Sequence, residues 1–284
     1  MDTSIIFPHL HITLDNVGKG FYIGPFFIAY YGVIIAIGML VGVSVVLKEA
    51  KRVGFSEDTF LDIALTTIVV GVLGARIYYV IFAWDYYKDN PLSIFNIRQG
   101  GLAIYGGVIA GIICIYVLSK LKKYSFLKTM DVAIIGVVIG QIFGRWGNFF
   151  NREVFGQYTD SLFAMLLPIN AIRSQGDVTT EMLNNLVSID GVDYISVHPT
   201  FLYESLWNLA LLIFIMCTRK NKRFDGYVFF TYLIGYGMGR FWIEGVRTDQ
   251  LKLWGTSLAV SQLIAAISVV VGVGLMVYNY KKSK

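Results

Sequence analysis

The segment DVAIIGVVIGQIFGRWGNFFNREVFG, residues 131–156, determines how the rest of the chain is interpreted. It begins as an apolar run of the kind that spans a membrane, and the run reaches an arginine, Arg145, near its end. On a helix, Arg145 and Asn148 are three residues apart and share a face, which suits an anionic oxygen ligand such as phosphate. The alternative is that Arg145 only extends to the nearer membrane surface.

The composition of the chain indicates a polytopic membrane protein. Of its 284 residues, 56% are hydrophobic and only 15% are charged, which is too apolar for a soluble domain. The net charge of +5 comes from short basic clusters between apolar runs, which argues against nucleic-acid binding. Cys114 and Cys217 lie in apolar segments without a metal-binding spacing, so we expect no disulfide, no zinc or other metal, and no cofactor.

Windows of about 20 apolar residues predict an all-α fold of seven transmembrane helices in a single membrane domain, residues 1–284. Basic residues after the first, third, fifth and seventh spans include fourteen of the 24 Lys and Arg residues. The positive-inside rule therefore places the N-terminus outside and the C-terminus in the cytoplasm. Residues 157–197 are expected to form a small extracytoplasmic cap. The predicted spans are 24–47, 60–83, 101–119, 131–150, 200–217, 226–244 and 256–279.

Polar residues of five predicted spans fall at one depth, in the outer half of the membrane. With a helical rise of about 1.5 Å per residue, Arg145 and Arg240 lie roughly 20 Å above the cytoplasmic edge of a core about 30 Å thick. Arg76 lies at a similar height, and Tyr31 and Tyr105 lie within about two helical turns of the outer edge. Extension of single arginines to the surface would not require this agreement, so a shared anion site is favoured.

The sixth predicted span carries a polar stripe that must face protein or a water-filled cavity. Tyr236, Arg240, Glu244 and Arg247 recur at i, i+4, i+8 and i+11, along one helical face. Arg240 and Glu244 could instead form a self-contained ion pair that locks helices together. In the fifth span, Glu204 could pair with one of the arginines or orient a hydroxyl group.

Residues 144–156 resemble the signature of the bacterial prolipoprotein diacylglyceryl transferases at every defined position. Three further blocks agree with this family: Tyr31-Gly32, residues 198–204 and residues 236–247. The resemblance implies an integral membrane enzyme of the bacterial cytoplasmic membrane, with its active site towards the outer leaflet. Such an enzyme moves the diacylglyceryl group of phosphatidylglycerol onto the lipobox cysteine thiol of a prolipoprotein and releases glycerol phosphate.

Combined with this resemblance, the polar residues receive specific roles. Arg145 is assigned to phosphate binding, Arg240 to the leaving group and Tyr105 to a hydrogen bond near the reacting thiol. The family often has a histidine in the block where this chain has Tyr105, and tyrosine is a poor base because its reference pKa is near 10. The predicted substrate-binding residues are Tyr31, Arg76, Asn148, Asn151, Glu153, Gly156, Glu204, Tyr236, Glu244 and Arg247.

Two other functions remain open from the residues alone. A transporter or channel would also place charges inside the membrane, but the charges here gather in the outer half without a matching inner set. A metal-dependent phospholipid head-group transferase would need clustered carboxylates, whereas Glu204 and Glu244 stand alone in their spans. Spacing alone also leaves a purely structural lipid-binding protein open.

Overall fold

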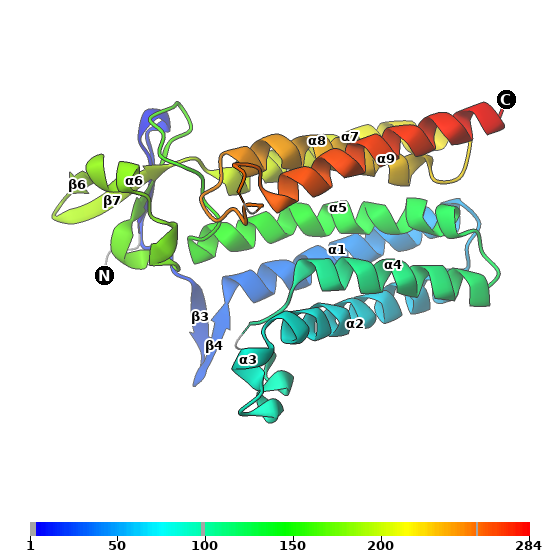
Figure 1. Ribbon diagram of the computed structural model, residues 1–284, viewed down its shortest axis with the longest axis horizontal. Helices are drawn as coiled ribbons and strands as arrows, with labels where there is room; N and C mark the ends of the chain where they lie inside the picture. Colours follow the sequence, from blue (N-terminus) through cyan, green and yellow to red (C-terminus); the bar gives the residue numbers. More distant parts are fainter. Residues whose placement is uncertain (1–3, 98–99, 254) are drawn as a thin grey trace. The chain divides into compact units, whose positions relative to one another are not determined.

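The computed structural model describes residues 4–97, 100–253 and 255–284 (Figure 1). The chain divides into two compact units: residues 1–42 together with 135–284, and residues 43–134. The first unit contains the signature segment, and the second contains Arg76 and Tyr105. The expectation of a single membrane domain stays a prediction.

The described residues form seven long helices, each overlapping a predicted span. Six of them are long and apolar enough to cross a membrane, so the chain is a multi-pass membrane protein. The exception is α8, which carries Arg240, Glu244 and several glycines and is therefore less apolar. The seven are α1 (Tyr30–Arg52), α2 (Glu57–Phe82), α4 (Ile104–Leu121), α5 (Phe126–Asn151), α7 (Thr200–Thr218), α8 (Tyr227–Gly245) and α9 (Val260–Lys282).

The prediction of an all-α chain is wrong for the segments outside the helices. Five short strands form an antiparallel sheet in the order β2-β1-β5-β7-β6. Strands β1 and β5 pair across a long stretch of sequence, with Ile6 opposite Leu166, so no local pattern indicates the pairing. The strands are β1 (Ile5–Phe7), β2 (Ile12–Leu14), β5 (Met165–Pro168), β6 (Val187–Ile189) and β7 (Val192–Val197).

This sheet orders residues 157–197 together with the N-terminal segment. Short helices fill the connections: η1 (Pro8–Leu10), η4 (Ile169–Ala171), η5 (Gln175–Asp177) and α6 (Thr180–Asn184). The inner side chains of the sheet form one buried cluster with Phe149 of α5 and Phe201 of α7. The sheet therefore packs on the ends of these two helices, which carry the signature segment and the start of the fifth span (Figure 1).

A second, two-stranded sheet precedes α1. Strands β3 (Gly20–Ile23) and β4 (Phe26–Ala29) form a hairpin in which Gly20 lies opposite Ala29. Near the tip of the hairpin, Tyr22 is 71% exposed and Phe26 is 70% exposed. Exposed aromatic side chains beside the start of a membrane helix are typical of the membrane–water interface.

The unit of residues 43–134 is built on the close packing of α2 and α4. Gly74 and Gly106 lie where the helices meet, and a Cβ atom added to Gly74 would lie 2.8 Å from the Gly106 carbonyl oxygen. Small residues at such crossings let helices approach closely in lipid. After α2, α3 (Trp84–Tyr87) and η2 (Pro91–Phe95) lead towards α4.

Candidate active site

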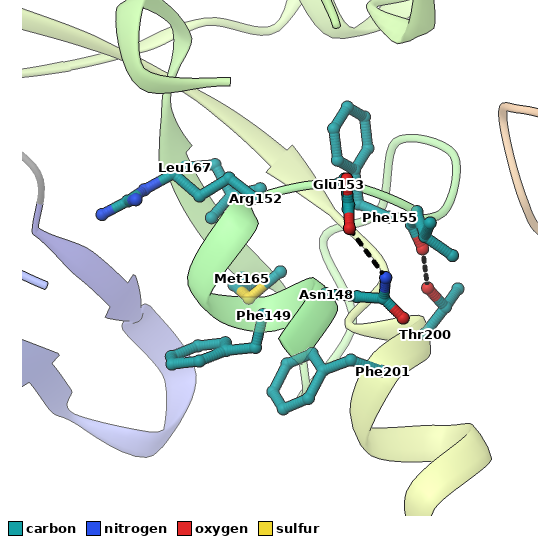
Figure 2. A pocket seen from close by; sticks show the side chains of 10 residues that line it. Asn148, Phe149, Arg152, Glu153, Phe155, Met165, Leu167, Thr200 and Phe201 are labelled. Carbon is teal, nitrogen blue, oxygen red and sulfur yellow. Dashed lines mark hydrogen bonds between the residues drawn. The ribbon is translucent and has the colours of Figure 1, made fainter. Parts of the chain in front are cut away.

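The end of α5 and the turn after it form the first part of the site. The backbone reverses through positive φ angles at Arg152 and Val154, of 52° and 62°. This reversal brings the Glu153 carboxylate back over the helix, where its Oε1 accepts hydrogen bonds from Asn148 Nδ2 at 3.0 Å and Asn151 Nδ2 at 3.1 Å. Figure 2 shows Asn148 and Glu153 pointing towards one another.

Arg152 has a different role from its neighbours in the signature. Its side chain points away from Asn148 and Glu153 (Figure 2), and the residue is 1% exposed. Its guanidinium donates to the backbone carbonyls of Val17 and Phe150, so it joins the signature turn to the N-terminal segment. The cavity beneath this turn is only ≈ 10 Å³, about the size of one water molecule, so the turn itself is closely packed.

Arg173, in the segment between α5 and α7, completes the surroundings of Glu153. Its Nη1 lies 2.8 Å from Glu153 Oε2, and its side chain is 59% exposed. One carboxylate is therefore held by two amides and one guanidinium. The sequence did not indicate this partner, because Arg173 lies twenty residues away in a segment without a recognisable motif.

The centre of the site is a carboxylate held between two arginines from different helices. Arg145 Nη2 on α5 lies 2.6 Å from Glu204 Oε1 on α7, and Arg240 Nη1 on α8 lies 3.3 Å from Glu204 Oε2. Glu204 is 2% exposed. Arg145 also donates from Nη1 to Asn148 Oδ1 at 3.3 Å, which connects this centre to the signature turn. Glu204 thus pairs with both predicted catalytic arginines, where the sequence suggested one.

The stripe on α8 extends the charged centre outwards. Arg240 Nη2 lies 2.5 Å from Glu244 Oε2, which also lies 3.7 Å from Arg247 Nη1. Arg247 then holds Asp249 through two parallel bonds, from Nε to Oδ1 at 2.9 Å and from Nη2 to Oδ2 at 2.7 Å. The Arg240–Glu244 pair is thus one link in a longer network. Asp249 was not predicted, because it follows the helix and leaves the i, i+4 pattern.

The Arg247–Asp249 pair fixes the charge of both groups. Burial acts to raise the pKa of Asp249, but the hydrogen bonds and charge of Arg247 outweigh it, so this pKa lies below its usual value. Burial also opposes the charge on Arg247, yet Asp249 raises the pKa of the guanidinium. Three arginines and three carboxylates therefore alternate from Arg145 to Asp249, and the connected centre is close to neutral.

Two glycines show how closely the surrounding elements approach. A Cβ atom on Gly147 would lie 2.3 Å from Cδ2 of Tyr31, so the Tyr31 ring of α1 lies directly over α5. A Cβ atom on Gly156 would lie 2.6 Å from His198 Cβ and 2.8 Å from the Val246 carbonyl oxygen. Three segments therefore meet at Gly156: the one that follows α5, the one that precedes α7 and the one that follows α8.

Below the arginines lies a layer of uncharged polar side chains. Tyr236 stacks on Tyr232 with ring centroids 5.2 Å apart, and Gln141 Nε2 donates to the Tyr232 hydroxyl at 2.8 Å. Asn208 lies one helical turn below Glu204 on α7 and is 0% exposed. Within the described part of the chain, neither polar atom of the Asn208 amide has a hydrogen-bond partner.

Arg76 and Tyr105 belong to the other compact unit, residues 43–134. Arg76 is 7% exposed, and all its N–H-bearing nitrogens donate to backbone carbonyls of one loop. Its guanidinium thus holds backbone carbonyls of the segment that precedes α4. Tyr105 is the second residue of α4. The substrate roles of Arg76 and Tyr105 stay predictions. The Arg76 acceptors are the carbonyls of Ser93, Ile94, Asn96, Gly100 and Gly101.

His198, before α7, suits a structural role. Its Nδ1 lies 3.2 Å from the Tyr203 hydroxyl, and burial lowers the pKa of the imidazole. The neutral ring lies at the junction with Gly156, whose N–H donates to the His198 carbonyl at 2.9 Å.

In chemical terms, the geometry suits recognition of an oxyanion. An arginine offers five N–H donors, and Glu204, Glu244 and Asn148 occupy only some of those on Arg145 and Arg240. Guanidinium groups that are held in place before a ligand arrives can stabilise negative charge that develops on a phosphate oxygen. The buried surroundings strengthen this effect because they screen charge less than water does.

Comparisons with known proteins identify the family. A family model described as prolipoprotein diacylglyceryl transferase matches residues 19–278. The chain is 43% identical over 257 residues to the phosphatidylglycerol–prolipoprotein diacylglyceryl transferase of Clostridioides difficile (strain 630), covering 90% of this chain and 93% of the relative. The protein of the same name from Bacillus mycoides (strain KBAB4) is 42% identical, over 91% of this chain and 90% of the relative. The one from Bacillus cereus (strain Q1) is also 42% identical, over 94% of this chain and 93% of the relative. The chain therefore belongs to the prolipoprotein diacylglyceryl transferase family.

Proposed function

We propose that this protein transfers the diacylglyceryl group of phosphatidylglycerol to the lipobox cysteine of a prolipoprotein, the first step of lipoprotein maturation. The observation that carries the proposal is the pair formed by Arg145 and Arg240, which come from separate helices to one buried centre. Membership of the family and the names of its relatives supply the two substrates.

The reaction needs an anion site next to an electrophilic carbon. The cysteine sulfur, having lost its proton, forms a bond to the terminal glyceryl carbon of the diacylglyceryl group. The bond from that carbon to the phosphate oxygen breaks, and its electron pair stays on the departing glycerol phosphate. Negative charge therefore grows on the phosphate as the reaction proceeds, and guanidinium donors stabilise it more strongly in the transition state than in the bound lipid.

We assign roles within this site by position. Arg145 binds the phosphate, and Arg240 stabilises the leaving oxygen. Asn148, Glu153 and Tyr31 hold the glycerol headgroup, with Asn151 and Arg173 fixing the Glu153 carboxylate. Glu244 and Tyr236 position Arg240, and Arg247 with Asp249 closes the outer end of the network.

Tyr105 contributes a hydrogen bond near the thiol in this proposal, without acting as the base. A phenol hydroxyl can donate a hydrogen bond towards the reacting sulfur. The base that accepts the thiol proton is therefore sought elsewhere or in the solvent.

The proposed orientation follows the basic loops. Seven spans, including α8, would place the N-terminus and the β-sheet outside and the C-terminus in the cytoplasm. The arginine pair then faces the outer leaflet of a bacterial cytoplasmic membrane. There it would meet prolipoproteins whose signal peptide has been inserted into the membrane.

A reconstituted assay tests the function directly. Purified protein is incubated with phosphatidylglycerol and a lipobox peptide, and the peptide mass is measured. We expect a mass gain of one diacylglyceryl group on cysteine, which Arg145→Ala should reduce at least about a hundredfold, as for loss of a donor to developing charge. Arg219→Ala, at the opposite end of α7, serves as the matched arginine control. Normal transfer by Arg145→Ala would refute the assigned site.

A further inference from the structure

A second cavity lies far from the arginine pair within the same compact unit. It has a volume of ≈ 540 Å³ and lies between the segment that precedes α8 and the C-terminal end of α9. In Figure 1 this end of α9 is the end farther from the five-stranded β-sheet. Tyr227 on its wall is thirteen residues from Arg240 along α8, or roughly 20 Å at 1.5 Å per residue. It is therefore a separate site.

The cavity is strongly cationic. Arg223, Lys281 and Lys284 line it, and none of them has an acidic partner among the described residues. Asp225, the acidic side chain nearest to Arg223 along the chain, is engaged by Lys222, whose Nζ lies 3.0 Å from Asp225 Oδ1. Three positively charged side chains around one hollow favour an anionic ligand.

One tyrosine holds two of these cations in place. The Tyr280 hydroxyl accepts a hydrogen bond from Arg223 Nη1 at 2.8 Å. The Arg223 guanidinium carbon lies 5.2 Å, and Lys284 Nζ 5.4 Å, from the centre of the Tyr280 ring. Cation–π contacts at such distances restrain both side chains around the ring. Arg223 and Lys284 are therefore both restrained by contacts with one ring.

The start of α8 adds a further positive field. Tyr227 is its first residue, its first turn holds no acidic residue, and among the residues that the structure describes no side chain caps it. The N-terminus of a helix carries a partial positive charge that favours anions. Because this terminus and the three cations surround the same cavity, their effects add.

Most of the remaining wall is apolar and points to a lipid. Phe224, Met276 and Val277 line the cavity beside the polar Asn221, and only 11% of the apolar window of α9 is buried within the protein. The cavity wall is thus continuous with a helix surface that faces lipid. A soluble phosphate would use the cations alone, whereas a phospholipid would use both the cations and the apolar wall.

We propose that this cavity binds the headgroup phosphate of an anionic phospholipid at the membrane surface opposite the arginine pair. Arg223 and Lys284 hold the phosphate, and an acyl chain lies along Phe224 and α9. The site is independent of the transfer reaction and would bind lipids that the enzyme does not consume.

Native mass spectrometry of the purified full-length protein tests this proposal. Phosphatidic acid is the anionic probe and phosphatidylcholine the neutral one, each added to delipidated protein in detergent. We expect wild-type protein to retain phosphatidic acid about tenfold more than phosphatidylcholine, a difference equivalent to one favourable charged contact. The double variant Arg223→Gln/Lys284→Gln should lose this preference.

A matched double variant controls for general surface charge. Lys220→Gln/Lys282→Gln removes two positive charges from the same end of the molecule without touching the cavity lining. It should keep the preference within about twofold. Equal loss in both double variants, or no loss in Arg223→Gln/Lys284→Gln, would overturn the proposal.

Two further measurements separate folding and ligand type. If Arg223→Gln/Lys284→Gln has a lowered melting temperature in lipid-free detergent, Tyr280→Phe replaces it, since that change removes only the hydroxyl that holds Arg223. This variant should weaken retention about threefold, and unchanged retention would count against the site. Displacement of phosphatidic acid by millimolar inorganic phosphate would show that the cavity is a soluble-anion site. Transfer from phosphatidylglycerol should be unchanged in all these variants.

Discussion

Arg145 on α5 and Arg240 on α8 contact the same carboxylate, that of Glu204 on α7. A carboxylate has a planar array of acceptors much like two oxygens of a phosphate, so Glu204 offers the arginines a partner of the ligand's own type. In the absence of lipid it keeps two like charges close together inside the membrane. The contact of both arginines with Glu204 also fixes the distance between the two guanidinium groups before a phosphate binds.

Glu204→Gln should therefore lower stability and make it depend on lipid. Removal of one partner from a buried ion pair leaves uncompensated charge, at a cost of about 3 kcal/mol. Thermal unfolding in detergent would measure the loss. Added phosphatidylglycerol should raise the melting temperature of Glu204→Gln more than that of wild type, because the lipid phosphate replaces the missing anion. An equal rise in melting temperature in both proteins would mean that the lipid phosphate does not bind at this centre.

Glu153 and Arg173 should differ in importance although they contact one another. The Arg173 side chain is 59% exposed, so water and ions can replace its interaction, and Arg173→Ala should lower transfer less than about threefold. Glu153→Ala removes the acceptor shared by Asn148 and Asn151, and we expect a loss of about a hundredfold or more. Initial rates with phosphatidylglycerol and a lipobox peptide give both numbers. Similar losses in the two variants would contradict the headgroup role of Glu153.

Helix positions and the Arg240–Glu244–Arg247 stripe could be predicted because they follow local rules, namely apolar length and the 3.6-residue period. Other features depend on pairings between distant segments. Residues 5–14 and 165–197 form one sheet only when β1 meets β5. Likewise, Arg173 and Asp249 enter the site through turns that no helical period describes. The position of Glu204 inside a span already suggested that it has an ionic partner. That it bridges two arginines could not be predicted, because this depends on how three helices pack together.

Asp249→Asn should show how the outer end of the network depends on pH. The folded pKa of Asp249 lies below the unfolded value, which is about 3.9. Its contribution is therefore fully present above the unfolded pKa and is lost as the pH falls through the folded pKa. At pH 7 the variant should be less stable by about 2 kcal/mol. Melting curves should give a constant difference between pH 5 and 8 and a shrinking one below about pH 4. A difference that grew in acid would contradict the Arg247 pairing.

Tyr105→Phe tests whether the hydroxyl moves a proton. If it only donates a hydrogen bond near the thiol, its loss should lower kcat about tenfold, as for one neutral hydrogen bond. Direct proton transfer would instead cost several hundredfold, within the range for general acid–base catalysis. Rates measured from about pH 6 to 9 add a second criterion, since a variant that loses only a hydrogen bond keeps the shape of the wild-type pH profile, whereas loss of a proton-transfer group changes it. Ile104→Val, the preceding position, is the neighbouring control.

Asn208→Leu addresses the buried layer below the arginine pair. A buried amide without partners costs about 1–3 kcal/mol, and leucine has nearly the same shape without polar atoms. Because Asn208 is 0% exposed and both of its polar atoms lack partners in the described chain, the variant should be more stable than wild type. Ser205→Ala, one turn nearer the arginines, is the control, since its hydroxyl donates to the Ile142 carbonyl at 3.4 Å and its loss should destabilise slightly. A lower melting temperature for Asn208→Leu would mean that the amide is satisfied in the membrane by a bound polar molecule. That molecule would then lie one helical turn beneath Glu204, next to the reaction centre.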